Sequence, residues 1–243
     1  MSDSLVVNEI YLSVQGESTW SGLPCIFIRL TACNLRCSYC DTAYAFTEGK
    51  RESLKDILRK IGELAIPYAG STAPRLPLVE LTGGEPLLQK PAIALMNQLC
   101  DAGYTVLLET SGAHDVSGVD SRVHKIMDLK SPSSGELDRM NWENLKHLTN
   151  NDEIKFVLAS AQDYEWMKNV IAERELSGIC PLLVSWVHPL NADQQDPSLK
   201  TFPADHQPID RKDLVERIVA DALPVRFQVQ MHKVVWPPDQ RAV

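Results

Sequence analysis

Three cysteines, Cys33, Cys37 and Cys40, lie within eight residues in a C-x3-C-x2-C spacing, although the whole chain has only six. Thiolates are soft ligands that select zinc, copper(I) or iron-sulfur clusters. Structural zinc takes four ligands, but no fourth ligand stands nearby, since the first histidine after the triplet is His114. A 4Fe-4S cluster held by three thiolates leaves one iron open to a small molecule. The spacing therefore favours such a cluster over structural or disulfide-bonded cysteines.

Four polar turns have the residue types of a binding site, and each follows an apolar run. They are Gln15–Glu17, Thr82–Glu85, Glu109–Gly112 and Lys130–Ser134. The carboxyl ends of strands are where α/β folds place ligands, and glycine permits close approach of the backbone. Taken one at a time, each turn is also typical of a solvated connection or a helix cap.

The last apolar segment carries alternating polar residues. Gln228, Gln230 and His232 are two residues apart, so a strand over 226–231 would direct them to one face. Polar groups that face inward without partners are costly. The pattern therefore favours a row of side chains that faces a ligand.

Alternating strands and helices must position these residues. The patterns predict strands at 24–30, 78–81, 105–109, 125–129, 153–158, 182–187 and 226–231, helices at 53–67, 88–102, 164–175 and 211–222, and a surface connection at 68–77. Ser53 and Asp56 have capping-box spacing at the start of the first helix. Strands rich in Val, Ile and Leu that alternate with helices indicate a parallel sheet covered by helices. The pattern alone leaves open both a partial barrel and a flat doubly wound sheet.

Length and composition fit one α/β domain over residues 1–243, with 44% hydrophobic residues to fill a core. The net charge of -8 and the lack of a Lys/Arg run argue against a nucleic-acid-binding surface. The N-terminus does not resemble a signal peptide, and no apolar stretch is long enough to span a membrane, so we expect a cytoplasmic protein. Cys25, Cys100 and Cys180 lie in apolar contexts and are expected to be free thiols.

The cysteine spacing resembles the signature of the radical S-adenosylmethionine (SAM) superfamily. Further stretches together resemble the 7-carboxy-7-deazaguanine synthase family: SVQGES (Ser13–Ser18), FIRLTACNLRCSYCDTAYAF (Phe27–Phe46), LTGGEPLLQ (Leu81–Gln89), ETSG (Glu109–Gly112), DLKSPSS (Asp128–Ser134) and FQVQMHK (Phe227–Lys233). The cysteine motif alone is typical of the whole superfamily. The QGE, CDT and QVQ-HK blocks at these relative positions are specific to the synthases.

This resemblance implies a fold, cofactors and a reaction. The fold is an α/β partial, roughly six-stranded TIM-like barrel of the radical SAM type, in one domain with a cluster loop at 31–46 and a polar excursion at about 191–208. The cofactors are a 4Fe-4S cluster, SAM and Mg²⁺. The reaction converts 6-carboxy-5,6,7,8-tetrahydropterin to 7-carboxy-7-deazaguanine with loss of ammonia. This carbon-nitrogen lyase step belongs to the biosynthesis of 7-deazapurines, namely preQ0 and the queuosine of tRNA.

The resemblance also implies roles for individual residues. Cys33, Cys37 and Cys40 would hold the 4Fe-4S cluster, and Thr42 would bind Mg²⁺. The residues implied to bind substrate are Val14, Gln15, Gly16, Glu17, Arg29, Thr82 and His232. Those implied to bind SAM are Tyr39, Asp41, Gly83, Gly84, Glu85, Ser111, Ser131 and Ser133.

The implied partners are a small-molecule pterin, an electron donor such as flavodoxin or ferredoxin, and a second copy of the chain in a homodimer. No nucleic acid or membrane is expected as a partner. Two alternatives stay open. A radical SAM activase of a glycyl-radical enzyme shares the cysteine triplet and the GGE motif, but it does not account for QGE, CDT and QVQ-HK together. A non-catalytic iron-sulfur module needs only the cysteines.

Three departures from the family pattern are visible. Ser18 and Ala32 stand where the family has glycine, and we expect Ala32 to fit unless its φ is positive. The tail after Lys233 differs in length and composition from that of the family. We therefore expect no substrate contact by the chain terminus.

Overall fold

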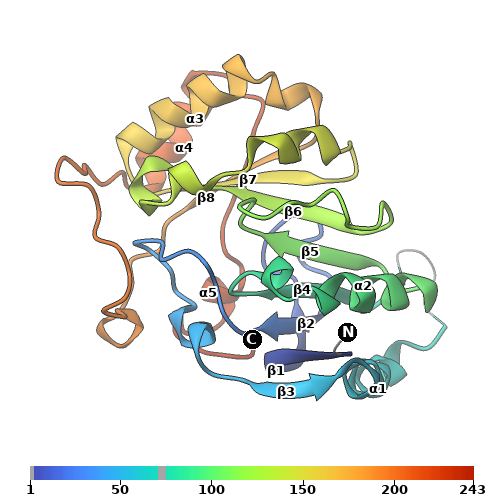
Figure 1. The fold of residues 1–243 in the computed structure, drawn as a ribbon. Helices are drawn as coiled ribbons and strands as arrows, with labels where there is room; N and C mark the ends of the chain where they lie inside the picture. Colours follow the sequence, from blue (N-terminus) through green and yellow to red (C-terminus); the bar gives the residue numbers. More distant parts are fainter. Residues whose placement is uncertain (1–2, 71–74) are drawn as a thin grey trace.

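Strand pairing organises the molecule. The computed structural model describes residues 3–70 and 75–243, and within them the strands form one nine-stranded sheet in the order β3-β1-β2-β4-β5-β6-β7-β8-β9 (Figure 1). The strands are β1 (Ser4–Val14), β2 (Pro24–Leu30), β3 (Lys50–Ser53), β4 (Leu78–Gly83), β5 (Val106–Thr110), β6 (His124–Leu129), β7 (Glu153–Leu158), β8 (Leu182–Trp186) and β9 (Arg226–Gln228). From β2 to β9 in this order, neighbouring strands are parallel. The predicted α/β class with a largely parallel sheet is confirmed.

Helices cover the sheet at both ends of the strand order. They are α1 (Leu54–Ala65), α2 (Pro91–Asp101), α3 (Ala161–Glu173), α4 (Arg211–Ala220) and α5 (His232–Val235). Short 3₁₀ helices are η1 (Ala43–Phe46), η2 (Ile66–Tyr68), η3 (Pro86–Leu88), η4 (Pro132–Ser134), η5 (Leu137–Arg139), η6 (Trp142–His147), η7 (Leu176–Gly178) and η8 (Ala192–Gln194). Figure 1 shows α1 and α2 beside the half of the sheet that contains β1 to β4, and α3 and α4 beside β7 and β8.

Local sequence explains where α1 begins. The Ser53 hydroxyl accepts a hydrogen bond from the backbone N–H of Asp56 at 3.1 Å, as the capping-box spacing predicted. Leu54, Ile57 and Ile61 are buried on one face of the helix. The predicted connection at 68–77 includes residues 71–74, which lie outside the described part of the chain. Within that part, no helix combines the length and the apolar character needed to cross a bilayer.

Alternation along the strands separates two faces of the sheet. On β2, Ile26 and Ile28 pack in the core beneath the helices, whereas Cys25 and Phe27 pack on the opposite face with Leu78, Leu107 and Ile126. We call this second face the inner face. Because side chains alternate, the next inward residues along these strands are polar. A charged layer therefore lies above a small apolar core on the inner face.

Two strands at one edge differ from the prediction. The apolar run before the Gln15–Glu17 turn is the second half of β1, which begins at Ser4 and has a register shift between Val7 and Glu9. Strand β3 was not predicted, because its sequence KRES has no apolar alternation and it pairs only as an edge strand. The parallel strands are the seven that the patterns predicted, whereas the family resemblance implied roughly six.

The direction of β1 changes how the Gln15–Glu17 turn reaches the inner face. β1 is antiparallel to β2, with Val14 opposite Pro24, so β1 ends at the opposite edge from the parallel strands. The following loop then crosses the inner face. The backbone N–H of Thr19 donates to the Glu153 carboxylate at 3.1 Å.

The C-terminal segment also differs from the prediction. β9 ends at Gln228, and α5 already begins at His232, so the predicted strand to residue 231 was too long. The backbone N–H of Met231 bonds Gly16 O at 2.9 Å, which turns the chain away from the sheet. Gln228 is therefore the last residue of the strand, and Gln230 and His232 lie beyond it. The Gln228 amide donates to the Ser185 hydroxyl at 3.1 Å.

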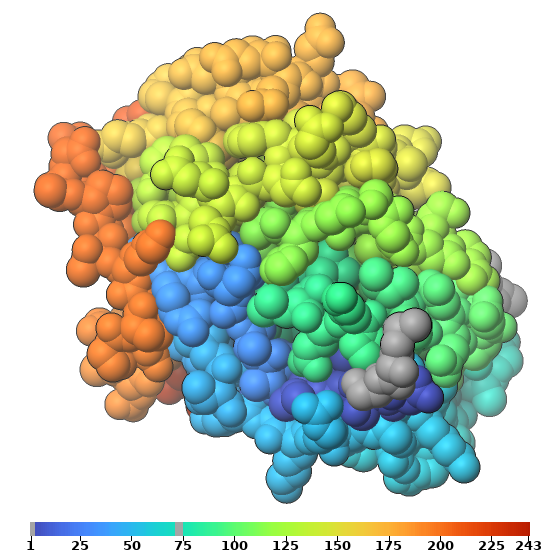
Figure 2. Space-filling model, viewed as in Figure 1, coloured from blue at the N-terminus to red at the C-terminus, as the bar shows by residue number. Residues whose placement is uncertain are grey.

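The polar excursion at 191–208 lies against the cluster loop. Figure 2 shows this orange segment beside the blue surface of the cluster loop. The backbone N–H of Lys200 donates to Arg36 O at 2.9 Å, and its ammonium lies 3.0 Å from the Glu136 carboxylate. The excursion thus braces one side of the cysteine segment.

Candidate active site

A cavity of about 270 Å³ lies on the inner face, at the carboxyl ends of the parallel strands. Its lining includes the cysteine triplet, Thr42, every residue predicted to bind substrate, and Tyr39, Asp41, Gly83, Gly84 and Ser111. The three predicted residues that do not line it are Glu85, Ser131 and Ser133. Distant parts of the sequence therefore meet in one place. The individual roles of these residues stay predictions.

The three cysteines have the surroundings of ligands rather than of reactive thiols. Burial raises the pKa of Cys37 to about 11 and that of Cys40 to about 12, so a metal must displace their protons on binding. All cysteines of the chain are free thiols. Among the described residues, no three Cys, His, Asp or Glu side chains converge on a single ion. Three thiols that line one cavity without such convergence fit a cluster that takes one thiolate at each of three irons.

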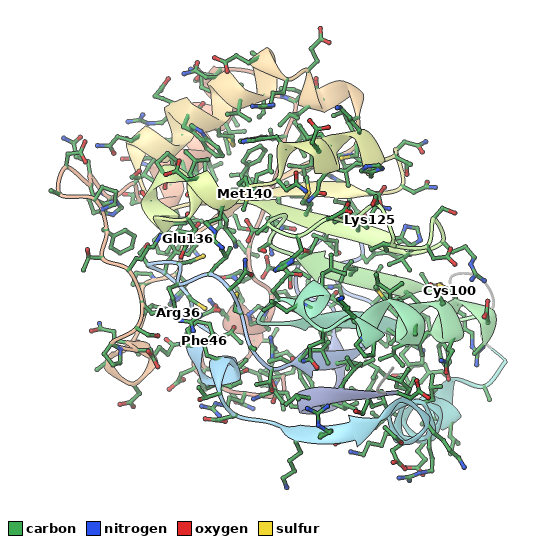
Figure 3. All side chains as sticks on the ribbon, viewed as in Figure 1. Arg36, Phe46, Cys100, Lys125, Glu136 and Met140 are labelled. Carbon is green, nitrogen blue, oxygen red and sulfur yellow. The ribbon has the colours of Figure 1, made fainter. Side chains whose placement is uncertain are left out.

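Arg36 holds the cysteine segment from outside. Its guanidinium donates to Cys33 O at 2.9 Å and to Leu35 O at 2.7 Å, and it stacks 4.1 Å over the Phe46 ring. Its backbone N–H donates to the Glu136 carboxylate at 2.6 Å. Figure 3 shows Arg36 between the labelled Phe46 and Glu136. These contacts fix the turn without using the thiols.

Two glycines let the end of β4 touch the cysteine segment. Gly83 has a φ of 135°, and a Cβ there would lie 2.2 Å from Leu30 O. A Cβ on Gly84 would lie 2.0 Å from Ala32 O and 2.9 Å from Cys33 Cβ. No side chain fits such a space. The predicted close approach of backbone at this loop is therefore present, and it is directed at the cluster loop.

Both departures from family glycines occur at positive φ. Ala32 has a φ of 79° and Ser18 a φ of 65°. The exception stated for Ala32, a positive φ, is therefore met, and the left-handed region costs a residue with a Cβ roughly 1–2 kcal/mol. The backbone N–H of Ala32 bonds Ala45 O at 2.8 Å, which helps to hold this conformation.

Glu85 lies behind the cavity lining. Its carboxylate accepts hydrogen bonds from Leu87 N at 3.0 Å, Ser111 N at 2.8 Å and the Ser111 hydroxyl at 2.6 Å. The side chain is fully buried. Protein donors thus already occupy the oxygens that were predicted to accept from the SAM ammonium. In this arrangement Glu85 fixes Ser111, which does line the cavity.

Ser131 and Ser133 are also buried behind the lining. The Ser131 hydroxyl donates to Val157 O at 3.1 Å and lies 3.4 Å from the Tyr39 hydroxyl. The Ser133 hydroxyl donates to that of Ser160 at 3.0 Å. These bonds join the turn after β6 to the cysteine segment and to the start of α3.

An ion pair joins the cysteine segment to α5. The Lys233 ammonium pairs with the Asp41 carboxylate, which also accepts from the Thr42 hydroxyl at 2.9 Å. Burial alone would raise the pKa of Asp41, but Lys233 holds it well below its usual range. Asp41 is therefore ionised and orients both neighbours.

The cavity floor carries a charge network that sequence analysis did not identify. Lys155 pairs with Glu109 and lies 3.3 Å from the Glu17 carboxylate. Burial, and then the nearby Glu109 carboxylate, raise the pKa of Glu80 well above its usual range. Burial opposes ionisation of Glu109 too, but Lys155 lowers its pKa. In the sequence, the signal for this network is the presence of single charged residues inside apolar strands.

His232 packs directly against the Gln15–Glu17 turn. A Cβ on Gly16 would lie 2.6 Å from the His232 Nδ1, so only glycine permits this contact. Burial lowers the pKa of His232, which favours the neutral imidazole. Gln230, beside it, donates to the Glu17 carboxylate at 3.0 Å.

The C-terminal tail returns to the cavity, although sequence analysis expected no role for it there. Residues 238–243 are part of the lining. The Arg241 guanidinium stacks 3.7 Å over the Tyr44 ring and lies 2.9 Å from the Glu48 carboxylate. These contacts seat the tail over one side of the cavity.

Arg29 is held by polar neighbours at the same side. Its Nε donates to the Glu9 carboxylate at 2.7 Å, and its Nη2 donates to the Tyr11 hydroxyl at 3.0 Å. The Tyr44 hydroxyl donates to the same Glu9 oxygen at 3.0 Å. The guanidinium is thus fixed in orientation at the cavity wall.

Comparisons with known proteins agree with this geometry. A family model described as the radical SAM superfamily matches residues 27–173. A 7-carboxy-7-deazaguanine synthase of Koribacter versatilis is 42% identical over 238 residues, which is 98% of this chain and 99% of the relative. A synthase of the same name from Chlorobaculum tepidum is 39% identical over 242 residues, or 98% of this chain and 97% of the relative.

Solved structures have the same fold. The crystal structure of QueE from Escherichia coli superposes with a TM-score of 0.68 at 22% identity, covering 94% of this chain and 95% of that one. Streptococcus suis SuiB bound to S-adenosylmethionine superposes with a TM-score of 0.53 at 13% identity, covering 82% of this chain and 48% of SuiB.

Proposed function

The chain belongs to the 7-carboxy-7-deazaguanine synthase family of the radical SAM superfamily, and from this premise we propose how its residues divide the work of that reaction. Its activity is that of a 7-carboxy-7-deazaguanine synthase, a lyase of deazapurine and queuosine biosynthesis. The family implies a 4Fe-4S cluster and SAM. The sequence match to named synthases over nearly the full chain excludes the two alternatives, a glycyl-radical activase and a non-catalytic iron-sulfur module.

The observation that carries the proposal is the convergence of the cysteine triplet and the substrate-predicted residues on one cavity. Cys33, Cys37 and Cys40 would hold the cluster, because their thiols are the soft donors it requires. The cluster and SAM together supply, when bound, the radical that starts the chemistry on the substrate. The protein then has to bind, orient and shield the reactants.

We assign the SAM side of the cavity to the backbone of Gly83 and Gly84 and to Ser111, Tyr39 and Asp41. Gly83 and Gly84 line the cavity, where their backbone groups can bond the cofactor's amino acid part. Their lack of a side chain lets this backbone lie directly against the cluster loop. Glu85, Ser131 and Ser133 would act from behind this wall, since their own bonds hold its turns in place.

The substrate side comprises Arg29, Thr82, His232 and the turn from Val14 to Glu17. Arg29 suits a carboxylate, because its guanidinium is planar and always charged. His232 would be a neutral imidazole, able to accept or donate one hydrogen bond to the ring. The tail at 238–243 would exclude water from this side.

We place Mg²⁺ at Thr42 as a proposal. Mg²⁺ prefers oxygen ligands and keeps several waters, so one hydroxyl suffices only if substrate oxygens complete the set. The Asp41 carboxylate supports this position, because it accepts from the Thr42 hydroxyl at 2.9 Å and so orients the Thr42 oxygen. Measuring Mg²⁺ dependence of turnover in wild type and in Thr42→Val tests the assignment, and equal dependence would contradict it.

We further propose one working domain, a homodimer and an electron donor of the flavodoxin or ferredoxin type. One sheet containing every described strand supports the single domain. Val229, Val234 and Val235 are exposed beside edge strand β9, and this apolar patch supports a subunit contact. Light scattering on the purified protein measures its mass in solution and so distinguishes a dimer from a monomer. Reduction by either donor can be followed by loss of cluster absorbance.

The deciding experiment is an anaerobic turnover assay of the reconstituted, reduced protein with SAM, Mg²⁺ and 6-carboxy-tetrahydropterin, read by mass spectrometry. We expect 7-carboxy-7-deazaguanine from wild type and none from Cys37→Ala. Formation of 5'-deoxyadenosine with intact pterin would leave the superfamily chemistry standing and refute the substrate.

A further inference from the structure

Glu80 differs from the other carboxylates of the cavity floor. It lies on the inner face of β4 with a relative exposure of 2%, and its Oε2 accepts from the Gln15 side-chain amide. Within the described part of the chain, its Oε1 has no hydrogen-bond partner. Glu17 and Glu109, in contrast, each pair with Lys155 through one oxygen and accept from a neutral donor at the other. Glu80 thus presents one free acceptor to the cavity.

The strand register places Glu80 one layer below the predicted carboxylate-binding residue. Phe27 pairs with Glu80, and Arg29 pairs with Thr82, so the two layers are two residues, or roughly 6.6 Å, apart along the strands. The cysteine segment follows β2 above Arg29. A flat ligand whose carboxylate lies at the Arg29 layer therefore extends its opposite edge toward Glu80. Phe27, which pairs with Glu80, lines the cavity at this depth and offers apolar contact to a ring face.

We propose that Glu80 is a specificity-determining residue whose Oε1 accepts a hydrogen bond from the 2-amino group of a 2-amino-4-oxopyrimidine ring. This inference rests on the proposed function, since the pterin substrate carries that ring. An acceptor that a bound ligand covers without donating to it is costly, and a ligand with a 2-oxo group would place a second acceptor opposite the first. The free oxygen therefore both attracts the amino compound and rejects the oxo compound.

Hydrogen bonds on the protein side orient this acceptor. The Gln15 Oε1 accepts from the backbone N–H of Glu17 at 2.8 Å, so the Gln15 Nε2 must be the group that faces Glu80. In Glu80→Gln, the new amide oxygen has to accept from Gln15, and its NH₂ then replaces Oε1 at the cavity. The variant would present a donor where wild type presents an acceptor. Glu80→Gln should therefore prefer a ligand with a 2-oxo group, whereas wild type prefers one with a 2-amino group.

The test compares two ligands that differ at one position, 6-carboxypterin with a 2-amino group and 6-carboxylumazine with a 2-oxo group. Each is titrated by fluorescence into the anaerobically reconstituted protein with SAM bound. At a pH above the raised pKa of Glu80, where its carboxyl group is ionised, we expect wild type to bind the pterin at least about tenfold more tightly, as a hydrogen bond to a charged group implies. Glu80→Gln should favour the lumazine, and Glu80→Leu should show no preference.

Glu153→Gln is the matched control. Glu153 is also a buried carboxylate on the inner face, but it lies at the start of β7 and bonds the Thr19 backbone rather than lining the cavity. Its variant should keep the wild-type ratio of affinities. A ratio is informative even if a variant binds both ligands more weakly.

Two results would overturn the inference: no preference in wild type, or a wild-type ratio in Glu80→Gln. The proposed function fails separately, through absence of 7-carboxy-7-deazaguanine in the turnover assay of wild type. A reversed ratio in Glu80→Gln without wild-type turnover would therefore uphold ring selection by Glu80 and refute the reaction.

Discussion

Removing the Lys155 side chain should affect stability and binding together. Lys155 is 5% exposed and is the cation that pairs with both Glu17 and Glu109. Loss of one partner of a buried ion pair costs about 3–5 kcal/mol, because the remaining charge is left without compensation. In a chain of 243 residues, this corresponds to a fall in Tm of roughly 6–20 °C. We therefore expect Lys155→Met to unfold at a clearly lower temperature.

The loss of thermal stability in Lys155→Met should depend on pH. Without Lys155, the folded-state pKa of Glu109 would rise above its unfolded value, instead of lying below its usual range. A raised carboxyl pKa leaves stability intact below the unfolded pKa and destabilises as pH rises through the folded pKa. The difference in Tm between wild type and Lys155→Met should therefore be larger at about pH 8 than at about pH 5.

Thermal unfolding followed by circular dichroism measures this effect, and titration with 6-carboxypterin measures binding. Lys125→Met is the matched control, because Lys125 is as buried as Lys155 and pairs with Asp152 at 3.0 Å, but this pair does not line the cavity. It should lower Tm without weakening pterin binding. The double variant Lys155→Met/Glu109→Gln should recover part of the stability. The reasoning is refuted if Tm is unchanged in Lys155→Met, or if adding Glu109→Gln lowers it further.

Three further outcomes are expected. Ala32→Gly should raise Tm by about 2–4 °C in a melting experiment, because glycine relieves up to roughly 1 kcal/mol of strain at positive φ; an unchanged Tm would mean that Ala32 is not strained. Gly84→Ala should reduce iron and sulfide content to that of Cys37→Ala, since the Cβ would lie 2.0 Å from Ala32 O; full loading would contradict the tight packing. Affinity for 6-carboxypterin should increase as pH rises through the raised pKa of Glu80, because a hydrogen-bond donor on the ligand favours the ionised acid. The charged neighbours of Glu80 are Glu109, Lys155, Glu17 and Arg29. The Glu80→Leu variant should lose this pH dependence of binding.

Local signals in the sequence identified much of this protein. The cysteine spacing predicted a cluster loop, and strands β2, β5, β6, β7 and β8 lie within a residue or two of their predicted ranges. The start of α1 followed from one serine and one aspartate. These features depend on neighbours along the chain, so spacing and periodicity are sufficient to predict them.

Features that depend on contacts between distant segments could not be predicted in this way. The direction of β1 is set by pairing with β2 and β3, and it decides that the Gln15–Glu17 turn reaches the cavity from the opposite edge. The predicted strand that would align Gln228 with Gln230 and His232 ends early, because the backbone of Met231 bonds Gly16, more than two hundred residues earlier in the chain. The positive φ of Ala32 was also invisible in the residue types.

The sequence by itself predicted ligands for the cluster, and it determined the alternation of strands and helices and the family to which the chain belongs. Only the tertiary structure decided that Glu17, Glu80, Glu109 and Lys155 share one buried floor and that the tail closes over one side of it. The physical reason is that the role of a charged residue inside an apolar strand depends on the residue with which it pairs, and the sequence alone does not show that residue. Three of these four charges come from different strands, and the fourth from the loop after β1.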